Sequence, residues 1–194
     1  MTFEQVAILS VEYLEKEKIP YMMTGALVVN YHGKPRMTHD IDFVVNITNK
    51  EIQKITELFN KDFFISEESI RSALAENSMF NIIHKETGSK IDFWILKDDE
   101  YNKTAFARRK SYPYQEKEIS LATPEDTIIS KLEWYKMSDV EKHYFDAVNI
   151  YSIQGNNLDK NYITDWCQKK SLTELWRKIQ KMLIYDKSQK NKEI

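Results

Sequence analysis

One stretch limits the fold more than any other: residues 22–46, MMTGALVVNYHGKPRMTHDIDFVVN. It predicts a strand, a tight turn, a short helix, a basic loop and a second strand with two carboxylates, Asp40 and Asp42. Because side chains alternate along a strand, these aspartates point to one face, roughly 7 Å apart. Like charges this close cost stability unless a cation compensates them, and Mg²⁺ commonly binds one or two carboxylates plus substrate phosphates. The alternative is two solvated aspartates on an exposed strand.

The residues ahead of that strand suit an anion. Gly25 stands between an apolar strand at 19–23 and a helical run at 26–31. A glycine at such a turn lets backbone N–H groups approach a phosphate at a helix start. Thr24 adds a hydroxyl, and Arg36, in the basic loop, adds a planar fork of donors. Each feature is ordinary alone, but the order of turn, basic loop and paired acids suits a metal-bound triphosphate.

The run T-G-A-x6-G-x-x-R-x-T-x-D-I-D, from Thr24 to Asp42, resembles the signature of the nucleotidyltransferase superfamily, and in particular of the AbiEii-like toxins. Those proteins usually have Gly-Gly or Gly-Ser at the turn, where this chain has Thr24-Gly25. The resemblance implies a mixed sheet with a helical C-terminal part, two bound Mg²⁺ ions, and transfer of an NMP from an NTP such as ATP. It also suggests tRNA or another RNA as acceptor and a cognate antitoxin as partner.

The chain as a whole predicts an α/β (α+β) fold with a mixed β-sheet core flanked by helices. We expect a core domain over residues 1–122 and a C-terminal helical lobe, packed on that core, over residues 123–194. Hydrophobic periodicity and turn residues predict the elements. The helices are expected at 2–18, 26–31, 48–61, 67–76, 98–110, from 124, and at 138–153, 159–169 and 172–185, and the remaining strands at 63–65, 79–84, 90–96 and 112–122.

Composition excludes some classes of function. The net charge is −2, so no overall basic field draws the chain to nucleic acid or to membranes. The one cysteine, Cys167, permits no internal disulfide and fits a reducing cytoplasm. No apolar run reaches the roughly 20 residues that span a bilayer, and the N-terminus does not have the pattern of a signal peptide. We therefore expect a cytoplasmic location and no membrane partner.

A third carboxylate, Asp92, interrupts an apolar strand. Its apolar neighbours point to the opposite face, so Asp92 is either a surface residue on an edge strand or a third metal ligand and general base. The pattern Ile-Asp-Phe around Asp92 repeats the pattern around Asp42, which supports the second interpretation. In the nucleotidyltransferases that this chain resembles, the position matches the third catalytic carboxylate.

A lysine lies on the apolar face of the helix that starts at Pro124. Lys131 either extends its ammonium to solvent at the helix edge or reaches a triphosphate or an acidic cluster, because an unpaired buried charge is costly. The run P-E-D-x-x-x-x-K-L resembles the lysine motif of AbiEii-like proteins, which supports the second role. Relatives often have Asp-x-x-Asp in the next helix, where this chain has His143 and Asp146. Asp146 could bind Lys131, orient the acceptor or cap a loop.

These residues predict one site. The candidate metal ligands are Asp40, Asp42 and Asp92, which with Lys131 are also the candidate catalytic residues. The candidate nucleotide-binding residues are Thr24, Gly25, Arg36 and Lys131, with Asp146 as an accessory residue.

Three interpretations stay open. The chain is a Mg²⁺-dependent nucleotidyltransferase, a catalytically degenerate module that binds a nucleotide or a partner, or a metal-dependent phosphohydrolase or nuclease. Retention of all three aspartates argues against the second. A glycine turn followed by an arginine argues against the third, because a nuclease has no need to hold a free triphosphate.

Overall fold

The structure, a computed structural model, describes residues 1–190, with side chains described as far as Met182. The end of the predicted C-terminal lobe, residues 191–194, lies outside the described residues. Packing divides the chain into two units. The first contains Met1–Val28 and Arg36–Ala122, and the second contains Val29–Pro35 and the described chain from Thr123 onward. That residues 1–122 and 123–194 are separate domains stays a prediction.

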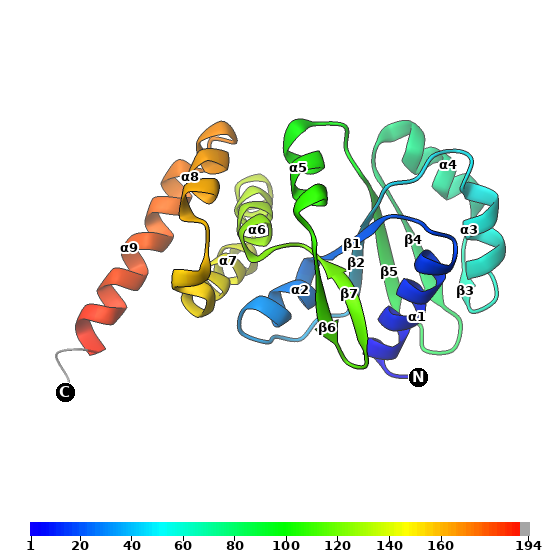
Figure 1. The fold of residues 1–194 in the computed structure, drawn as a ribbon, viewed down its shortest axis with the longest axis horizontal. Coiled ribbons are helices and arrows are strands. Elements are labelled where there is room, and N and C mark those ends of the chain that lie inside the picture. The colour runs from blue at the N-terminus through cyan, green and yellow to red at the C-terminus, as the bar shows by residue number, and fades with distance from the viewer. Residues whose placement is uncertain (191–194) are drawn as a thin grey trace. The chain divides into compact units, whose positions relative to one another are not determined.

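The first unit contains, within the described residues, a seven-stranded sheet with the order β3-β4-β5-β2-β1-β7-β6 (Figure 1). Its strands are β1 Tyr21–Thr24, β2 Asp40–Val45, β3 Phe63–Phe64, β4 Met79–His84, β5 Lys90–Ile95, β6 Lys110–Tyr114 and β7 Lys117–Leu121. The pairs β2–β5 and β1–β7 are parallel, and the others are antiparallel. The predicted mixed-sheet α/β class is therefore confirmed.

Aromatic residues attach helices to one face of this sheet. The helices of the first unit are α1 Phe3–Lys16, α3 Ile52–Phe59, α4 Glu67–Glu76 and α5 Glu100–Arg108, and α2 Gly25–His32 begins in this unit and ends in the second. Phe43 and Phe93 stack across β2 and β5 with ring centroids 5.5 Å apart. Phe59 of α3 meets Phe93 edge-on at 5.7 Å, and Tyr13 of α1 meets Phe59 at 5.2 Å. Helices α1 and α3 therefore cover the Phe43–Phe93 face, where aromatic contacts add to the area buried.

The second unit is helical, with α6 Pro124–Ser138, α7 Glu141–Gln154, a 3-10 turn at Gly155–Asn157, α8 Lys160–Lys169 and α9 Thr173–Lys190. The predicted start of α6 is confirmed: Thr123 is the N-cap, its hydroxyl accepts the Asp126 N–H at 3.2 Å, and Pro124 follows. Asp139 ends α6 in the left-handed region at φ 54°. The short turn after it lets α7 return beside α6.

The sheet differs from expectation at one edge. Residues 112–122 were predicted as one strand, but the chain forms a hairpin of β6 and β7. The turn passes through Gln115, whose φ of 56° is left-handed. Glycine and asparagine are the usual residues there, so the sequence contains no ordinary turn signal.

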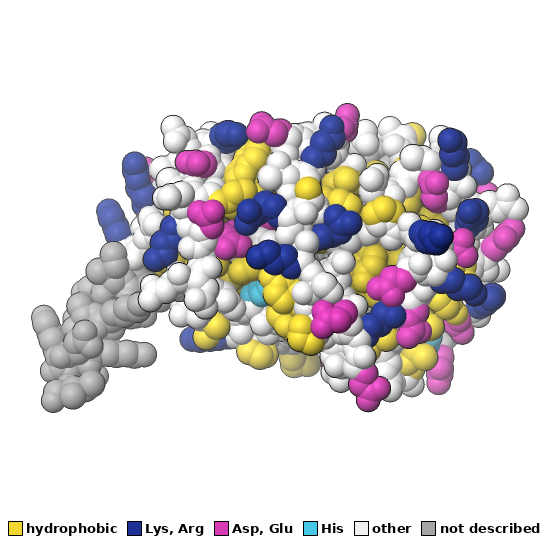
Figure 2. All heavy atoms as spheres, viewed as in Figure 1, with side chains coloured by type: hydrophobic (Ala, Val, Ile, Leu, Met, Phe, Trp, Pro, Cys, Tyr) yellow, Lys and Arg dark blue, Asp and Glu magenta, His cyan; other side chains and the backbone are white. Residues whose placement is uncertain are grey.

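Basic and acidic side chains are interspersed on the face drawn in Figure 2. Between residues 1 and 190, no helix combines the length and the apolar character needed to cross a membrane.

Candidate active site

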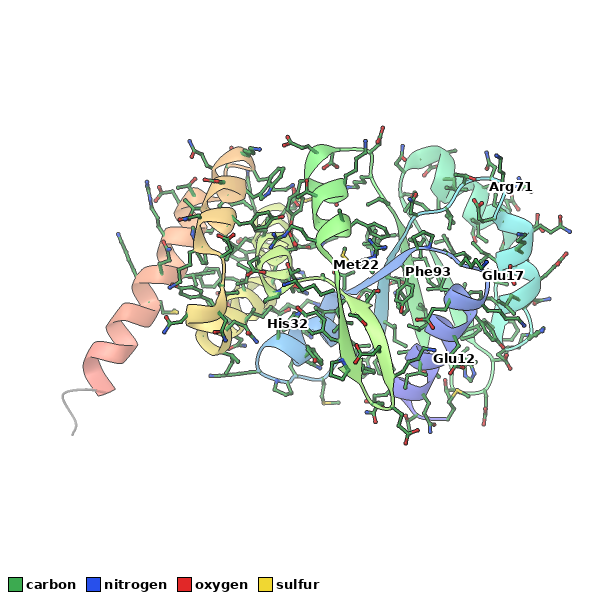
Figure 3. All side chains as sticks on the ribbon, in the orientation of Figure 1. Glu12, Glu17, Met22, His32, Arg71 and Phe93 are labelled. Atoms are coloured by element: carbon green, nitrogen blue, oxygen red, sulfur yellow. The ribbon has the colours of Figure 1, made fainter. Side chains whose placement is uncertain are left out.

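Strands β2 and β5 place three carboxylates on one face of the sheet. Asp42 lies directly opposite Asp92 in this parallel pair, and Asp40 lies opposite Lys90. Since side chains alternate along each strand, all four residues point away from the face that carries Phe93. Figure 3 labels Phe93 on that helix-covered face. The carboxylates therefore share the face that α1 and α3 leave uncovered.

The three carboxylates differ in exposure. The side chain of Asp40 is 50% exposed, whereas that of Asp92 is 9% exposed. The Oδ1 atom of Asp92 is buried and accepts no hydrogen bond from any described residue. A buried carboxylate oxygen without a donor is costly, so this atom is a candidate to bind a cation or to accept a proton.

Lys90 is the residue of this face that the sequence interpretation missed. Its Nζ lies 2.9 Å from Asp92 Oδ2 and 3.3 Å from Asp40 Oδ1. The hydrogen bond to Asp92, and then that to Asp40, raises the pKa of Lys90 above its ordinary value, although desolvation opposes the shift. Alternation along β5 was a usable signal, because it places residues 90 and 92 on one face. The contact with Asp40 depends on the register between β2 and β5, which no local pattern reveals.

Gly25 lies against the Asp42 carboxylate. Thr24 pairs with Asp42 across β1 and β2, and the chain then turns into α2 through Gly25 at φ 70°. A Cβ atom on residue 25 would lie 2.0 Å from Asp42 Oδ2 and 2.6 Å from its Cγ. Two independent features therefore require glycine at position 25: the left-handed backbone and the carboxylate beside it. The Gly25 turn and the start of α2 therefore lie beside Asp42, which in turn lies opposite Asp92.

The other predicted residues are placed as follows. Arg36 belongs to the first unit, in the loop before β2, where its guanidinium donates to the Met37 carbonyl at 3.1 Å. Lys131 and Asp146 belong to the second unit and form an ion pair between α6 and α7, with Nζ 3.1 Å from Oδ2. Both side chains of this pair are buried. Of the roles considered for Asp146, the geometry shows the contact with Lys131.

The carboxylate face fits a divalent cation by its chemistry. Asp40, Asp42 and Asp92 offer carboxylate oxygens, which are the ligands that Mg²⁺ prefers. One of these atoms, Asp92 Oδ1, accepts no hydrogen bond within the described chain. As they stand, no three His, Cys, Asp or Glu side chains in the described part of the protein are gathered closely enough to hold an ion. Lys90 occupies one side of the cluster, between Asp40 and Asp92.

Two hollows on the surface lie elsewhere. One of about 430 Å³ is lined by residues of α1 with Met1 and Glu86, and one of about 490 Å³ by residues of the second unit, including Tyr135 and Thr173. Neither is lined by a predicted site residue. The carboxylate face is the candidate site, because the chemistry of its side chains, rather than the volume of a hollow, determines what a site can do.

Comparison by sequence finds no relative: no protein-family model and no curated protein matches this chain. Comparison by structure, in contrast, finds solved proteins with a similar fold. A nucleotidyltransferase-like protein from Paracoccidioides brasiliensis has a TM-score of 0.56 at 12% identity, over 90% of this chain and 91% of that one. ANT(2'')-Ia, in complex with adenylyl-2''-tobramycin, has a TM-score of 0.55 at 11% identity, over 92% of this chain and 98% of that one.

A third similar structure is the lincosamide antibiotic adenylyltransferase LnuA with bound lincomycin. Its TM-score is 0.51 at 15% identity, over 79% of this chain and 98% of that one. The chain therefore has the fold of the nucleotidyltransferases. At these identities the likeness establishes the fold alone.

Proposed function

We propose that this protein is a Mg²⁺-dependent nucleotidyltransferase that moves an NMP from an NTP to a hydroxyl group of an acceptor. One observation carries the proposal: on a nucleotidyltransferase fold, Asp42 lies opposite Asp92 and directly against the Gly25 turn. This arrangement puts acidic metal ligands beside a turn that can bind phosphate, as a metal–triphosphate substrate requires.

Asp40, Asp42 and Asp92 are the residues that would hold the metal, with two Mg²⁺ ions expected from the family resemblance. When bound, Mg²⁺ stabilises negative charge on the phosphoryl oxygens and orients them. The backbone N–H groups at the start of α2 and the Thr24 hydroxyl bind the phosphates, since a helix N-terminus favours anions. The absence of a side chain on Gly25 lets a phosphate approach this backbone.

Asp92 accepts the proton in the transfer step. The acceptor hydroxyl oxygen forms a bond to the α-phosphorus, and the bond from that phosphorus to the bridging oxygen breaks, so that pyrophosphate leaves. The proton of the hydroxyl goes to the Asp92 carboxylate, whose buried Oδ1 accepts no hydrogen bond from the described residues. Arg36 balances the charge of the leaving pyrophosphate. The same role for Lys131, which pairs with Asp146 in the second unit, is proposed from the family resemblance alone.

The acceptor is proposed only as a class, a molecule with a hydroxyl group. The AbiEii-like resemblance favours tRNA or another RNA, with a toxin-like role, a cognate antitoxin and a cytoplasmic location. Two structures of similar fold instead contain antibiotics, lincomycin in one and adenylyl-2''-tobramycin in the other. Incubation with total RNA, an aminoglycoside or a lincosamide, each with all four NTPs labelled at the α-phosphate, distinguishes these acceptors.

Replacement of Asp42 tests the proposal directly. Asp42→Asn keeps the shape of the side chain but removes the charge that holds the metal, so label transfer should fall at least about a hundredfold while the circular dichroism spectrum stays unchanged. Asp98→Asn is the control, because Asp98 is an exposed aspartate paired with Lys103 outside the site. Full transfer by Asp42→Asn would refute the assignment.

Two further measurements separate the remaining interpretations. A degenerate binding module would show a thermal shift with NTP and Mg²⁺ but no turnover. A phosphohydrolase would release phosphate without labelling an acceptor, whereas a nucleotidyltransferase releases pyrophosphate in step with labelling.

A further inference from the structure

Lys90 places a positive charge inside the acidic cluster of Asp40, Asp42 and Asp92. It is the first residue of β5, it lies opposite Asp40, and it shares a face with Asp92 two residues on. Its ammonium contacts a carboxylate oxygen of each, at 3.3 and 2.9 Å. The Lys90 side chain is 40% exposed, so its stem has room to move without disturbing the core.

A metal ion and this ammonium compete for the same oxygens. Mg²⁺ binds oxygen at about 2.0–2.1 Å and requires ligands on several sides. An ammonium that donates to both Asp40 and Asp92 occupies lone pairs of the two carboxylates, and its charge repels a second cation within a few ångström. A divalent ion and the Lys90 ammonium therefore cannot bind these carboxylate oxygens at the same time.

We propose that Lys90 is an internal counter-ion of the acidic cluster, which holds Asp40 and Asp92 in the metal-free protein and must be displaced when a divalent ion binds. This inference rests on the proposed function, because it takes the aspartates as metal ligands. Lys90 is accordingly a positioning residue that lowers the affinity for the metal. It also keeps the buried carboxylate of Asp92 compensated while no ion is present.

The buried state of Asp92 explains why such a counter-ion is needed. A carboxylate that is 9% exposed loses most of its hydration, and it lies directly opposite a second carboxylate, Asp42. Without Lys90, the metal-free cluster would lose the ammonium that pairs with the buried carboxylate of Asp92. The repulsion between these carboxylates would then favour uptake of a divalent ion.

Calorimetric titration with Mn²⁺ tests the inference on the full chain. Lys90→Met keeps the length of the side chain and removes its charge, so the affinity for Mn²⁺ should rise roughly five- to tenfold, a factor that corresponds to the loss of one or two partly exposed ion pairs. Lys90→Arg keeps the charge and should stay within about twofold of the wild type. Lys117→Met is the matched control, because Lys117 is also a strand lysine of the first unit in an ion pair, 2.9 Å from Glu15. It makes the same change in net charge and should also stay within about twofold.

Thermal unfolding supplies a second readout. In EDTA, Lys90→Met should melt below the wild type, because Asp40 and Asp92 then lose the ammonium that pairs with both. Mn²⁺ should raise its melting temperature by more than it raises that of the wild type. A lysine with a purely structural role would lower both melting temperatures equally. If Lys90→Met does not fold, Lys90→Gln carries the same comparison.

The outcomes are distinct. Equal or weaker Mn²⁺ binding by Lys90→Met than by a wild type that does bind Mn²⁺ overturns the counter-ion and leaves the proposed function standing. Absence of Mn²⁺ binding in every variant overturns both proposals. Tighter binding by Lys90→Met, with Lys117→Met unchanged, supports the counter-ion.

Discussion

At the scale of single residues, Gly25 shows how the backbone and a site residue constrain one position. Its φ of 70° is unfavourable for any residue with a side chain, and the Asp42 carboxylate occupies the place where a Cβ would be. Thr24, the departure from the motif that the sequence resembles, lies at the preceding position and leaves this glycine intact. Thr24 faces Asp42 across the strand pair, so its hydroxyl is carried on the carboxylate face.

We expect Gly25→Ala to lower the free energy of unfolding by about 2–4 kcal/mol, from left-handed backbone strain plus the contact with Asp42. It should also lower label transfer, because Asp42 must move. Urea denaturation and the transfer assay measure the two effects.

Gly88→Ala is the control for the backbone term, since Gly88 has the same φ of 70° with nothing within 4 Å of the added Cβ. It should cost about 1–2 kcal/mol and leave transfer unchanged. If Gly25→Ala lowers the free energy of unfolding by no more than Gly88→Ala does, the contact between the added Cβ and Asp42 does not destabilise the protein.

At the scale of elements, α6 and α7 are joined by a buried ion pair. The side chains of Lys131 and Asp146 are 8% and 2% exposed, so removal of one charge takes its buried partner's ion pair away where solvent cannot replace it. The predicted position of Lys131 on the apolar face of α6 is thereby confirmed, since its neighbours Ile128 and Leu132 are buried with it.

Asp146→Ala should lower the free energy of unfolding by about 3–5 kcal/mol. The double variant Lys131→Met with Asp146→Leu should cost less than Asp146→Ala alone, because apolar residues fill the space without an isolated charge. Urea denaturation of the two proteins gives the comparison.

The exposed pair Arg177–Glu174 of α9 is the control, with side chains 61% and 84% exposed. Glu174→Ala should change stability by less than about 0.5 kcal/mol, since surface ion pairs contribute little. If the double variant is as unstable as Asp146→Ala, the loss comes from packing rather than from charge.

The edge of the sheet illustrates an element that local patterns describe poorly. Strand β6 contains Pro113, which removes a ladder donor and is tolerated because β6 lies last in the strand order. The hairpin between β6 and β7 turns at a left-handed glutamine. Its register is set by pairing between the strands, for example Tyr112 with Ile119, and this pairing compensates for the unfavourable turn residue.

At the scale of the whole molecule, the buried protons of Cys167 and Tyr21 contribute to the loss of stability at high pH. Burial raises the pKa of the Cys167 thiol from 9.0 to about 12. Burial, with a smaller contribution from the charge of Glu15, raises the pKa of Tyr21 from 10.0 to about 12, although a hydrogen bond from Ser120 opposes the shift. Both groups therefore stay neutral in the folded protein where the unfolded chain loses their protons.

The sign follows from this difference. Above about pH 9 the unfolded state binds fewer protons than the folded state, so the free energy of unfolding must fall with rising pH, until both forms are ionised near pH 12. Each group contributes up to about 2–4 kcal/mol of loss across that window. Cys167→Ala and Tyr21→Phe should each flatten the fall, measured by urea denaturation at about pH 8 and about pH 11. An equally steep fall in the double variant would assign alkaline unfolding to other groups.

Most of the fold and part of the site follow from the sequence. Helix α4 and strand β4 were predicted with the residues that they have, although the sequence pattern for α4 was weak. The glycine turn between the two strands is the signal that marks β4. The roles of the site residues stay predictions. The arrangement of these residues could not be predicted from the sequence. Lys90 lies between Asp40 and Asp92 because of the register between β2 and β5, which sequence patterns do not describe.

The sequence by itself determined the local relations: Asp40 and Asp42 share a face, a glycine follows Thr24, and Lys131 belongs to the apolar stripe of α6. These follow from the periods of strand and helix, which involve only near neighbours. Tertiary structure alone decided that Asp42 meets Asp92 and that Lys90 lies between Asp40 and Asp92. The physical reason is that residues fifty positions apart are aligned by packing, here the stacking of Phe43 on Phe93, which pins β2 against β5.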